Sequence, residues 1–308
     1  MTTTTSEGTY YVPEQSKLPI WASFGLFLTV YGAGHWINGN DQGPYIFLGG
    51  ALVFAVVLWN WFGTVINENM AGLNSLQLKR SYVWGMGWFI FSEVMFFAAF
   101  FGALFYVRNL ALPWLSGEGP DAATNEFLWK GFEASWPLMV TPDQAVKGAE
   151  AAVKGPEQSM SYSQVSSIWS WLPFWNTVIL LSSSVTVHFA HSAIKNNQRR
   201  LFNNWLGFTI VLALVFLGLQ VYEYYEAYSH MGLTLESGIY GTTFFMLTGF
   251  HGMHVFLGSF MLAVMWFRSV LKGHFKPNDQ FGFEASSWYW HFVDVVWVGL
   301  FFAVYIFG

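Results

Sequence analysis

One carboxylic acid, Glu93, lies inside an apolar stretch that reads FSEVMFFAAFF from residue 91 to residue 101. A charged group near the centre of a membrane helix costs at least about 2.5 kcal/mol, so this position favours the protonated acid. Two interpretations fit the pattern. Glu93 either exchanges protons as part of proton or charge transfer, or it is a neutral acid that hydrogen-bonds to a neighbouring helix.

Two pairs of histidines have a spacing of three residues, His188 with His191 and His251 with His254. This spacing puts both members of a pair on one helix face, where they could ligate a metal cluster or a haem. The chain contains no Glu-x-x-His motif, and histidines in glycine-rich membrane helices more often hydrogen-bond across an interface. We therefore expect these histidines to be buried polar groups that pack helices together, and we expect no metal site.

A further polar pair, His291 and Asp294, stands one helical turn apart in WYWHFVDVVWV. A local hydrogen bond would lower the cost of Asp294 in lipid and fix the orientation of its helix. Together with Glu93, this pair forms the predicted group of proton-linked or buried residues. Glu223 and Glu226, in QVYEYYEA, are expected to be solvated acids in a tyrosine-rich belt at the membrane surface.

These side chains have to be positioned by membrane-spanning helices, and the composition favours such helices. Of the 308 residues, 54% are hydrophobic and 10% are charged, whereas a soluble domain has about 25% charged residues. A span needs about 20 mostly apolar residues. Seven segments qualify, at 18–39, 43–66, 81–107, 172–194, 202–225, 238–268 and 284–307.

The predicted fold is therefore all-α, with a short segment at 1–17 and a single polytopic membrane domain of seven helices at 18–308. The long connection at 108–170 contains SGEGPDAATNE and TPDQAVKGAEAAVKGPEQSMS. Its proline, glycine and acidic residues indicate an aqueous loop, with a short surface helix near 142–154.

Lysine and arginine predict the orientation, because loops that carry them stay in the cytoplasm. With the N-terminus in the cytoplasm, nine of these residues lie on the cytoplasmic side and four on the other side, all four in the 108–170 loop. The C-terminus is then periplasmic. The chain has no cysteine, which excludes disulfides and thiolate metal sites, and no cleaved signal peptide is expected.

Several functions are excluded by missing motifs, because the sequence has no P-loop, no dinucleotide-binding glycine motif, no Gly-x-Ser-x-Gly and no HExxH. The residues alone indicate a bundle that is a subunit of something larger, and two alternatives remain. A secondary transporter could use Glu93 as its coupling acid, although only Glu93 and Asp294 lie deep in a span. A di-haem membrane cytochrome would show a Soret band.

Four segments resemble one family: SEVMFFAAFF (92–101), NTVILLSSSVTVHFAH (176–191), GIYGTTFFMLTGFHGMHVFLGS (238–259) and FGFEASSWYWHFVDVVW (281–297). They are similar to the cytochrome c oxidase subunit III family of haem-copper oxidases, of the bacterial aa3 type. A quinol-oxidising relative usually has five spans, so the two additional N-terminal spans favour the cytochrome c enzyme. The quinol oxidase version and the nitric-oxide-reductase-associated relative remain alternatives.

The resemblance implies an integral subunit without a redox centre, in a complex that reduces O₂ to water and pumps protons. Its helices would form two groups, the pair at 18–66 and a five-helix bundle at 81–308, around a lipid-filled V-shaped cleft. Subunit I, the main contact, and subunit II would carry haem a, haem a3, CuA and CuB, and cytochrome c would be the electron donor. This chain would bind phospholipid and support sustained turnover and proton uptake by subunit I.

The resemblance also assigns residues. Glu93 matches the family's membrane-buried glutamate, and His291 and Asp294 match its WYWHFVDVVW signature. After the second span the family commonly has two arginines, an aspartate and a His-His pair, whereas this chain reads WFGTVINENMAGLNS. The residues expected near phospholipid headgroups are Trp61, Glu68, Arg268 and Lys272. The expected location is the inner membrane of a bacterium.

Overall fold

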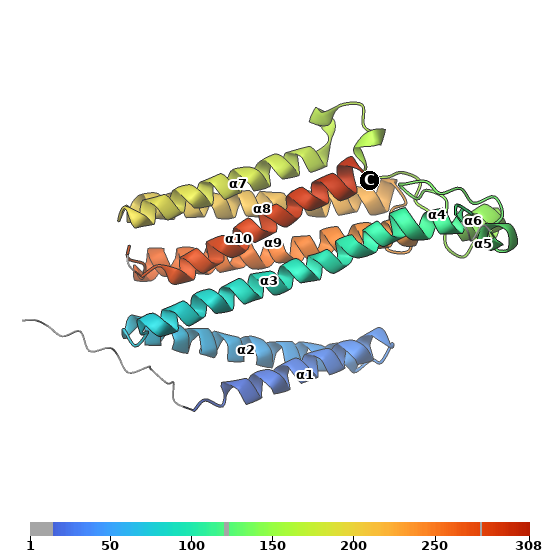
Figure 1. Ribbon diagram of the computed structural model, residues 1–308. Coiled ribbons are helices and arrows are strands. Elements are labelled where there is room, and N and C mark those ends of the chain that lie inside the picture. The colour runs from blue at the N-terminus through green and yellow to red at the C-terminus, as the bar shows by residue number, and fades with distance from the viewer. Residues whose placement is uncertain (1–14, 120–122, 278) are drawn as a thin grey trace, which may run out of the picture. The chain divides into compact units, whose positions relative to one another are not determined.

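The computed structural model describes residues 15–119, 123–277 and 279–308. Seven long helices account for most of these residues (Figure 1). Their bounds are α1 (Leu18–Ile37), α2 (Gly43–Met70), α3 (Leu76–Tyr106), α7 (Leu172–Lys195), α8 (Arg199–His230), α9 (Gly238–Lys272) and α10 (Phe281–Leu300). Each predicted segment therefore corresponds to a helix, although α3 begins five residues before the predicted span and α9 ends four residues after it.

Six helical stretches are long and apolar enough to cross a membrane. They are Gly43–Met70, Leu76–Leu115, Leu172–Lys195, Arg199–His230, Gly238–Lys272 and Phe281–Ile306. The helix α1 is not among them. The six stretches in the described part of the chain indicate a multi-pass membrane protein.

The chain divides into two compact units, Met1–Gly85 and Met86–Gly308, with the boundary inside α3. In the first unit α1 packs closely along α2, because glycines remove the side chains at the contact. A Cβ atom at Gly32 would lie 2.2 Å from the backbone nitrogen of Phe47, which no side chain could tolerate. Three further glycines of this pair make similar backbone approaches: Gly25, Gly43 and Gly50.

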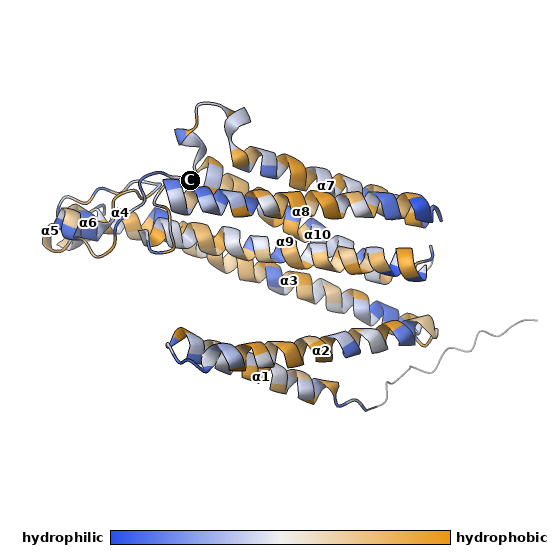
Figure 2. Ribbon diagram, turned by 180° about the vertical axis from the view of Figure 1, so that it is seen from behind, coloured by the Kyte–Doolittle hydropathy of each residue, from blue (hydrophilic) through white to orange (hydrophobic). Residues whose placement is uncertain are grey.

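The second unit has α10 at its centre, in contact with both α7 and α9, while α8 packs between α7 and α9. Its core is aromatic, and the largest fully buried side chains include Trp290 and Trp297 of α10. A π-helix at Phe301–Ile306 continues α10 and carries the buried Tyr305. Hydrophobic residues also cover the outward sides of these helices, as expected for a protein whose solvent is lipid (Figure 2).

The connection between α3 and α7 is ordered by short helices and by hydrogen bonds to the bundle. The predicted surface helix is α6 (Pro142–Lys147), followed by a 3-10 turn at Gly148–Glu150, and it begins where the Thr141 hydroxyl accepts a bond from the Gln144 amide. Farther along, the Glu157 and Gln158 amides donate to the Met231 carbonyl at the end of α8, at 3.0 and 3.2 Å. The loop therefore rests on the outer ends of the helices that follow it.

Candidate functional site

Glu93 of α3 pairs with His254 of α9, and the distance from Glu93 Oε2 to His254 Nε2 is 2.8 Å. The other ring nitrogen, Nδ1, lies 2.6 Å from the Phe250 carbonyl oxygen. A carbonyl can only accept, so Nδ1 carries a hydrogen and the Nε2 of a neutral imidazole does not. The contact therefore holds one proton, either on Glu93 or transferred to form an imidazolium–carboxylate pair.

Aromatic rings surround this pair on the inner side. The rings of Phe97 and His254 have centroids 4.9 Å apart, and Tyr289 stacks on the imidazole at 6.3 Å. The His254 side chain is 5% exposed, whereas Glu93 is 23% exposed. The histidine is thus shielded inside the bundle, whereas the acid is partly exposed at the surface of this chain.

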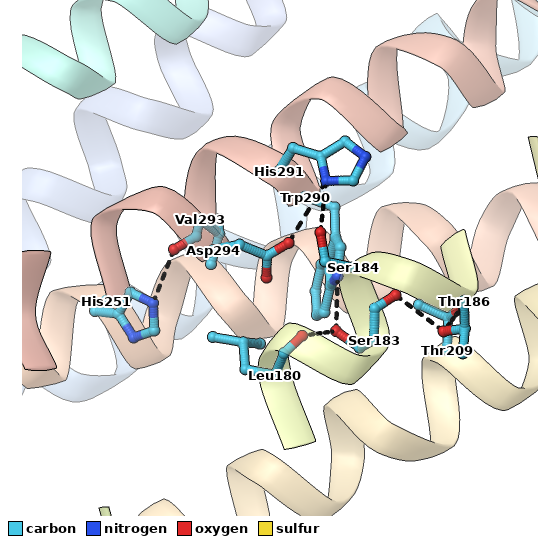
Figure 3. A network of polar contacts seen from close by, with 10 residues as sticks. All are labelled: Leu180, Ser183, Ser184, Thr186, Thr209, His251, Trp290, His291, Val293 and Asp294. Carbon is cyan, nitrogen blue, oxygen red and sulfur yellow. Dashed lines mark hydrogen bonds and ion pairs between the residues drawn. The ribbon is translucent and has the colours of Figure 1, made fainter. Parts of the chain in front are cut away.

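The second predicted pair, His291 and Asp294, is organised differently from the expectation (Figure 3). His291 Nδ1 lies 2.8 Å from the Ser184 Oγ on α7 and 3.6 Å from Asp294 Oδ2. Asp294 is buried, and within the described residues neither of its carboxyl oxygens has a hydrogen-bonding partner. Ser184, which the sequence did not single out, is therefore the closer partner of His291.

Hydroxyl groups within one turn of α7 join it to its neighbours (Figure 3). The Trp290 indole donates to Ser183 Oγ at 3.0 Å, which ties α7 to α10. Thr186 and Thr209 share a 2.7 Å bond between α7 and α8. Because every one of these groups is buried or nearly so, the polar contacts fix which faces of the helices meet.

Glu223 of α8 is fully buried, which contradicts the expectation of a solvated acid. Its Oε1 accepts a bond from the Tyr305 hydroxyl at 2.5 Å, and its Oε2 accepts one from the Asn176 amide at 3.3 Å. The acid thus joins α7, α8 and the C-terminal π-helix. The nearby Glu226 is more exposed and accepts a bond from Tyr222 at 2.8 Å.

Comparison with known proteins identifies the family. The model of the family "Cytochrome c oxidase subunit III" matches residues 8–114 and 166–308. A cytochrome c oxidase subunit 3 from Drosophila melanogaster is 34% identical over 306 residues, which is 99% of both chains. One from Prototheca wickerhamii is 35% identical over 300 residues, 97% of both chains.

The chain belongs to the cytochrome c oxidase subunit III family. It is a subunit of a respiratory oxidoreductase complex and is itself non-catalytic. These relatives support the prediction of a cytochrome c oxidase over the alternatives of a quinol oxidase, a transporter or a di-haem cytochrome. The family match omits residues 115–165, which form most of the loop between α3 and α7.

The other three histidines of the two predicted pairs have different environments in this subunit III. His251 is buried, with Nε2 3.2 Å from the Val293 carbonyl oxygen. His191 Nε2 lies 3.3 Å from Glu284 Oε1. His188 is exposed on the outer side of α7, so the prediction that it is a buried packing residue is wrong. Across the residues that the structure describes, no group of three or more histidine, aspartate and glutamate side chains could hold a metal ion.

The predicted headgroup residues lie in both units. Trp61 and Glu68 are on α2, and Arg268 and Lys272 are in the last turns of α9. The Arg268 guanidinium lies over the Phe275 ring at 4.9 Å, with Nε 3.5 Å from Nδ1 of His274. Burial lowers the pKa of the His274 imidazole, and the positive charges of Arg268 and Lys272 lower it further.

Proposed function

We propose that this subunit III supports sustained turnover and proton uptake of the catalytic subunit of its oxidase, and takes no part in electron transfer. Subunit I is its main contact and subunit II a second partner. Those subunits carry haem a, haem a3, CuA and CuB, and cytochrome c supplies electrons to the complex. Membership of the family supports this assignment.

The observation that carries the proton-linked role is the pair of Glu93 and His254. Its 2.8 Å contact holds one proton among apolar helices, and the Glu93 side chain is partly exposed at the surface of the chain. A group that can take up and release a proton in such a place can buffer protons close to a neighbouring uptake site. Asp294 and His291 are the second proton-linked pair in this proposal, since they also place an acid near an imidazole, in this case within the single helix α10.

Lipid binding forms the second part of the proposal. Phospholipid occupies a V-shaped cleft between the two helix groups, and this expectation rests on the family resemblance. Arg268 and Lys272 supply positive charge for headgroup phosphates, with Trp61 and Glu68 as further headgroup residues. The stacking of Arg268 on Phe275 supports this role, because it holds the guanidinium near the end of a span.

The proposed topology has seven membrane-spanning helices, with α1 as the first. The chain lies in the inner membrane of a bacterium, with its N-terminus in the cytoplasm and its C-terminus in the periplasm. The one-sided distribution of lysine and arginine among the short connections supports this orientation.

The test compares the purified oxidase with and without this subunit. Both preparations should show similar initial rates of O₂ reduction, and the preparation without the subunit should lose activity after fewer turnovers. A complex with Glu93→Gln should show an intermediate number of turnovers, and one with the control substitution Glu226→Gln should behave as the wild type. Equal numbers of turnovers in all four preparations would contradict the proposal.

A further inference from the structure

A small hollow lies between α3 and α9 inside the second unit, near the helix ends that lead to the 108–170 loop (Figure 1). Nearer the middle of these helices, phenylalanine rings fill the space between them. The ring centroids of Phe96 and Phe250 are 5.0 Å apart, and those of Phe100 and Phe250 are 5.3 Å apart. Farther out, the smaller Leu104 and Leu247 leave about 190 Å³ of empty space, including the open space at the mouth.

The walls of this hollow are apolar. They are formed by Leu104 of α3, Phe244 and Leu247 of α9 and Val304 of the C-terminal π-helix, all of which are buried. Trp136 of the loop completes the lining. Because a polar group placed against such walls would lose its hydrogen bonds to water, the hollow favours hydrocarbon.

One polar atom of the lining has no partner, the indole Nε1 of Trp136. This atom is buried, and no acceptor lies within reach of it among the described residues. The two other polar side chains of the lining are already bonded. The Thr243 hydroxyl donates to the Ile239 carbonyl at 2.7 Å, and the Tyr240 hydroxyl accepts from the Met160 amide at 3.3 Å. An indole N–H can only donate, so a ligand at this place has to bring an acceptor.

A positive charge lies beside the indole. Arg108 follows Leu104 by four residues, which is about one helical turn farther out, and its guanidinium carbon lies 6.0 Å from the centroid of the Trp136 ring. The Trp136 ring in turn packs edge-to-face on Tyr240 in the first turn of α9, with centroids 5.5 Å apart. The indole and the guanidinium therefore lie where a membrane helix begins, which is the level of lipid headgroups.

We propose that this site binds one phospholipid of the leaflet on the loop side. From the hollow outward, the chain presents an apolar wall, a hydrogen-bond donor and a cation. A phospholipid has the complementary groups in the same order, namely an acyl chain, an ester carbonyl and a phosphate. Part of the chain fills the hollow, the carbonyl accepts from Trp136 Nε1, and the phosphate pairs with Arg108.

This site is distinct from the proposed lipid cleft between the two helix groups. All of its residues belong to the second unit, and Trp136 lies in the segment 115–165, which the family match omits. The lipid joins this segment to α3 and α9. The proposal does not rest on the proposed function, because it requires only a membrane and the second unit of the chain.

The test uses the complex that a tagged form of the chain recovers, reconstituted into vesicles of phosphatidylethanolamine and phosphatidylglycerol. The probe is a phosphatidylglycerol that carries a diazirine near the start of one acyl chain. After illumination, the labelled peptides should include those around Leu104 and Trp136. Trp136→Phe and Arg108→Gln should each reduce this labelling per tagged chain by about fivefold, as expected for the loss of one hydrogen bond.

Two matched controls come from the same side of the chain. Trp169→Phe replaces an exposed indole, and Lys130→Gln replaces an exposed cation of the loop, so both should label as the wild type. If Trp136→Phe does not assemble, Arg108→Gln decides the outcome. Unchanged labelling with Arg108→Gln would overturn the proposal, and so would labelling that is spread evenly over the outward faces of α8 and α9.

Two further measurements identify the source of the phosphate. Excess inorganic phosphate should leave the labelling unchanged, whereas its loss would assign the site to free phosphate and overturn the proposal. A diacylglycerol with the same diazirine but no phosphate should label Leu104 and Trp136 peptides about fivefold less than the phospholipid does. Equal labelling by the two probes would contradict the pairing of a phosphate with Arg108.

Discussion

Replacing the buried acid Glu223 should destabilise the subunit much more than replacing its half-buried neighbour Glu226. Glu223→Leu removes the acceptor for both the Tyr305 hydroxyl and the Asn176 amide, in a place that water does not reach. A hydrogen bond between membrane helices contributes about 0.6 kcal/mol on average. A buried donor left without a partner costs about 1–3 kcal/mol. With two donors orphaned, we expect a loss of about 2–4 kcal/mol in the free energy of unfolding.

The assay is denaturant unfolding of the detergent-solubilised protein, followed by fluorescence, with the variants measured side by side. Glu223→Gln keeps one carbonyl acceptor and should lose about 1 kcal/mol. Glu226→Gln changes only the exposed bond to Tyr222 and should stay within about 0.5 kcal/mol of the wild type.

A double-mutant cycle identifies the cause. If Tyr305 depends on Glu223 for its acceptor, the loss caused by Glu223→Leu should shrink in a Tyr305→Phe background, because no hydroxyl is then left unpaired. Equal stability of Glu223→Leu and Glu226→Gln would refute the reasoning, and so would full additivity in the cycle.

Three further outcomes are expected. Glu93→Gln should leave the initial rate of O₂ reduction largely intact in an assembled complex, because the proposed function routes no electron through this chain. Immediate loss of all activity in an oxygen-electrode assay would contradict this. Ser183→Ala should destabilise the protein by about 1–3 kcal/mol, because it leaves the buried Trp290 indole without its acceptor. The control Ser182→Ala, which replaces an exposed serine, should have little effect. Equal losses of stability for the two variants in denaturant unfolding would argue against a contribution of the Ser183–Trp290 hydrogen bond. The pKa of His274 is lowered in the folded state, so on acidification the unfolded chain binds a proton before the folded chain does. The free energy of unfolding should therefore fall as the pH drops through about 6.5. His274→Asn should flatten this part of the stability profile, and an unchanged slope would exclude His274 as the cause.

The positions of the helices could be predicted from the sequence because long apolar segments have few alternatives in a membrane. The pairing of their faces could not. Glu93 and His254 are 161 positions apart, and Ser184 and His291 are 107 apart. Which faces meet depends on packing among several helices at once, and the spacing within one helix does not contain that information.

Glu223 is a different case, since the sequence did contain a signal for its burial. The buried residues of α8 recur every three or four positions, and Glu223 falls on this stripe: Phe202, Leu206, Thr209, Ala213, Phe216, Gln220, Glu223 and Ala227. Composition near the tyrosines suggested a solvated acid, whereas helical periodicity predicts a buried one. Helical periodicity also accounts for the exposure of His188. The buried stripe of α7 contains Val187 and Ala190, and His188 lies beside this stripe.

The most direct test of the central claim is the visible absorption spectrum of what a tagged form of this chain recovers from solubilised membranes. As a subunit of a cytochrome c oxidase without a redox centre of its own, the tagged chain should recover a haem-bearing partner in constant proportion. After the chains are separated, all haem absorption should remain with the partner. Recovery of no haem-bearing partner, or a Soret band that stays with the isolated chain, would contradict the account.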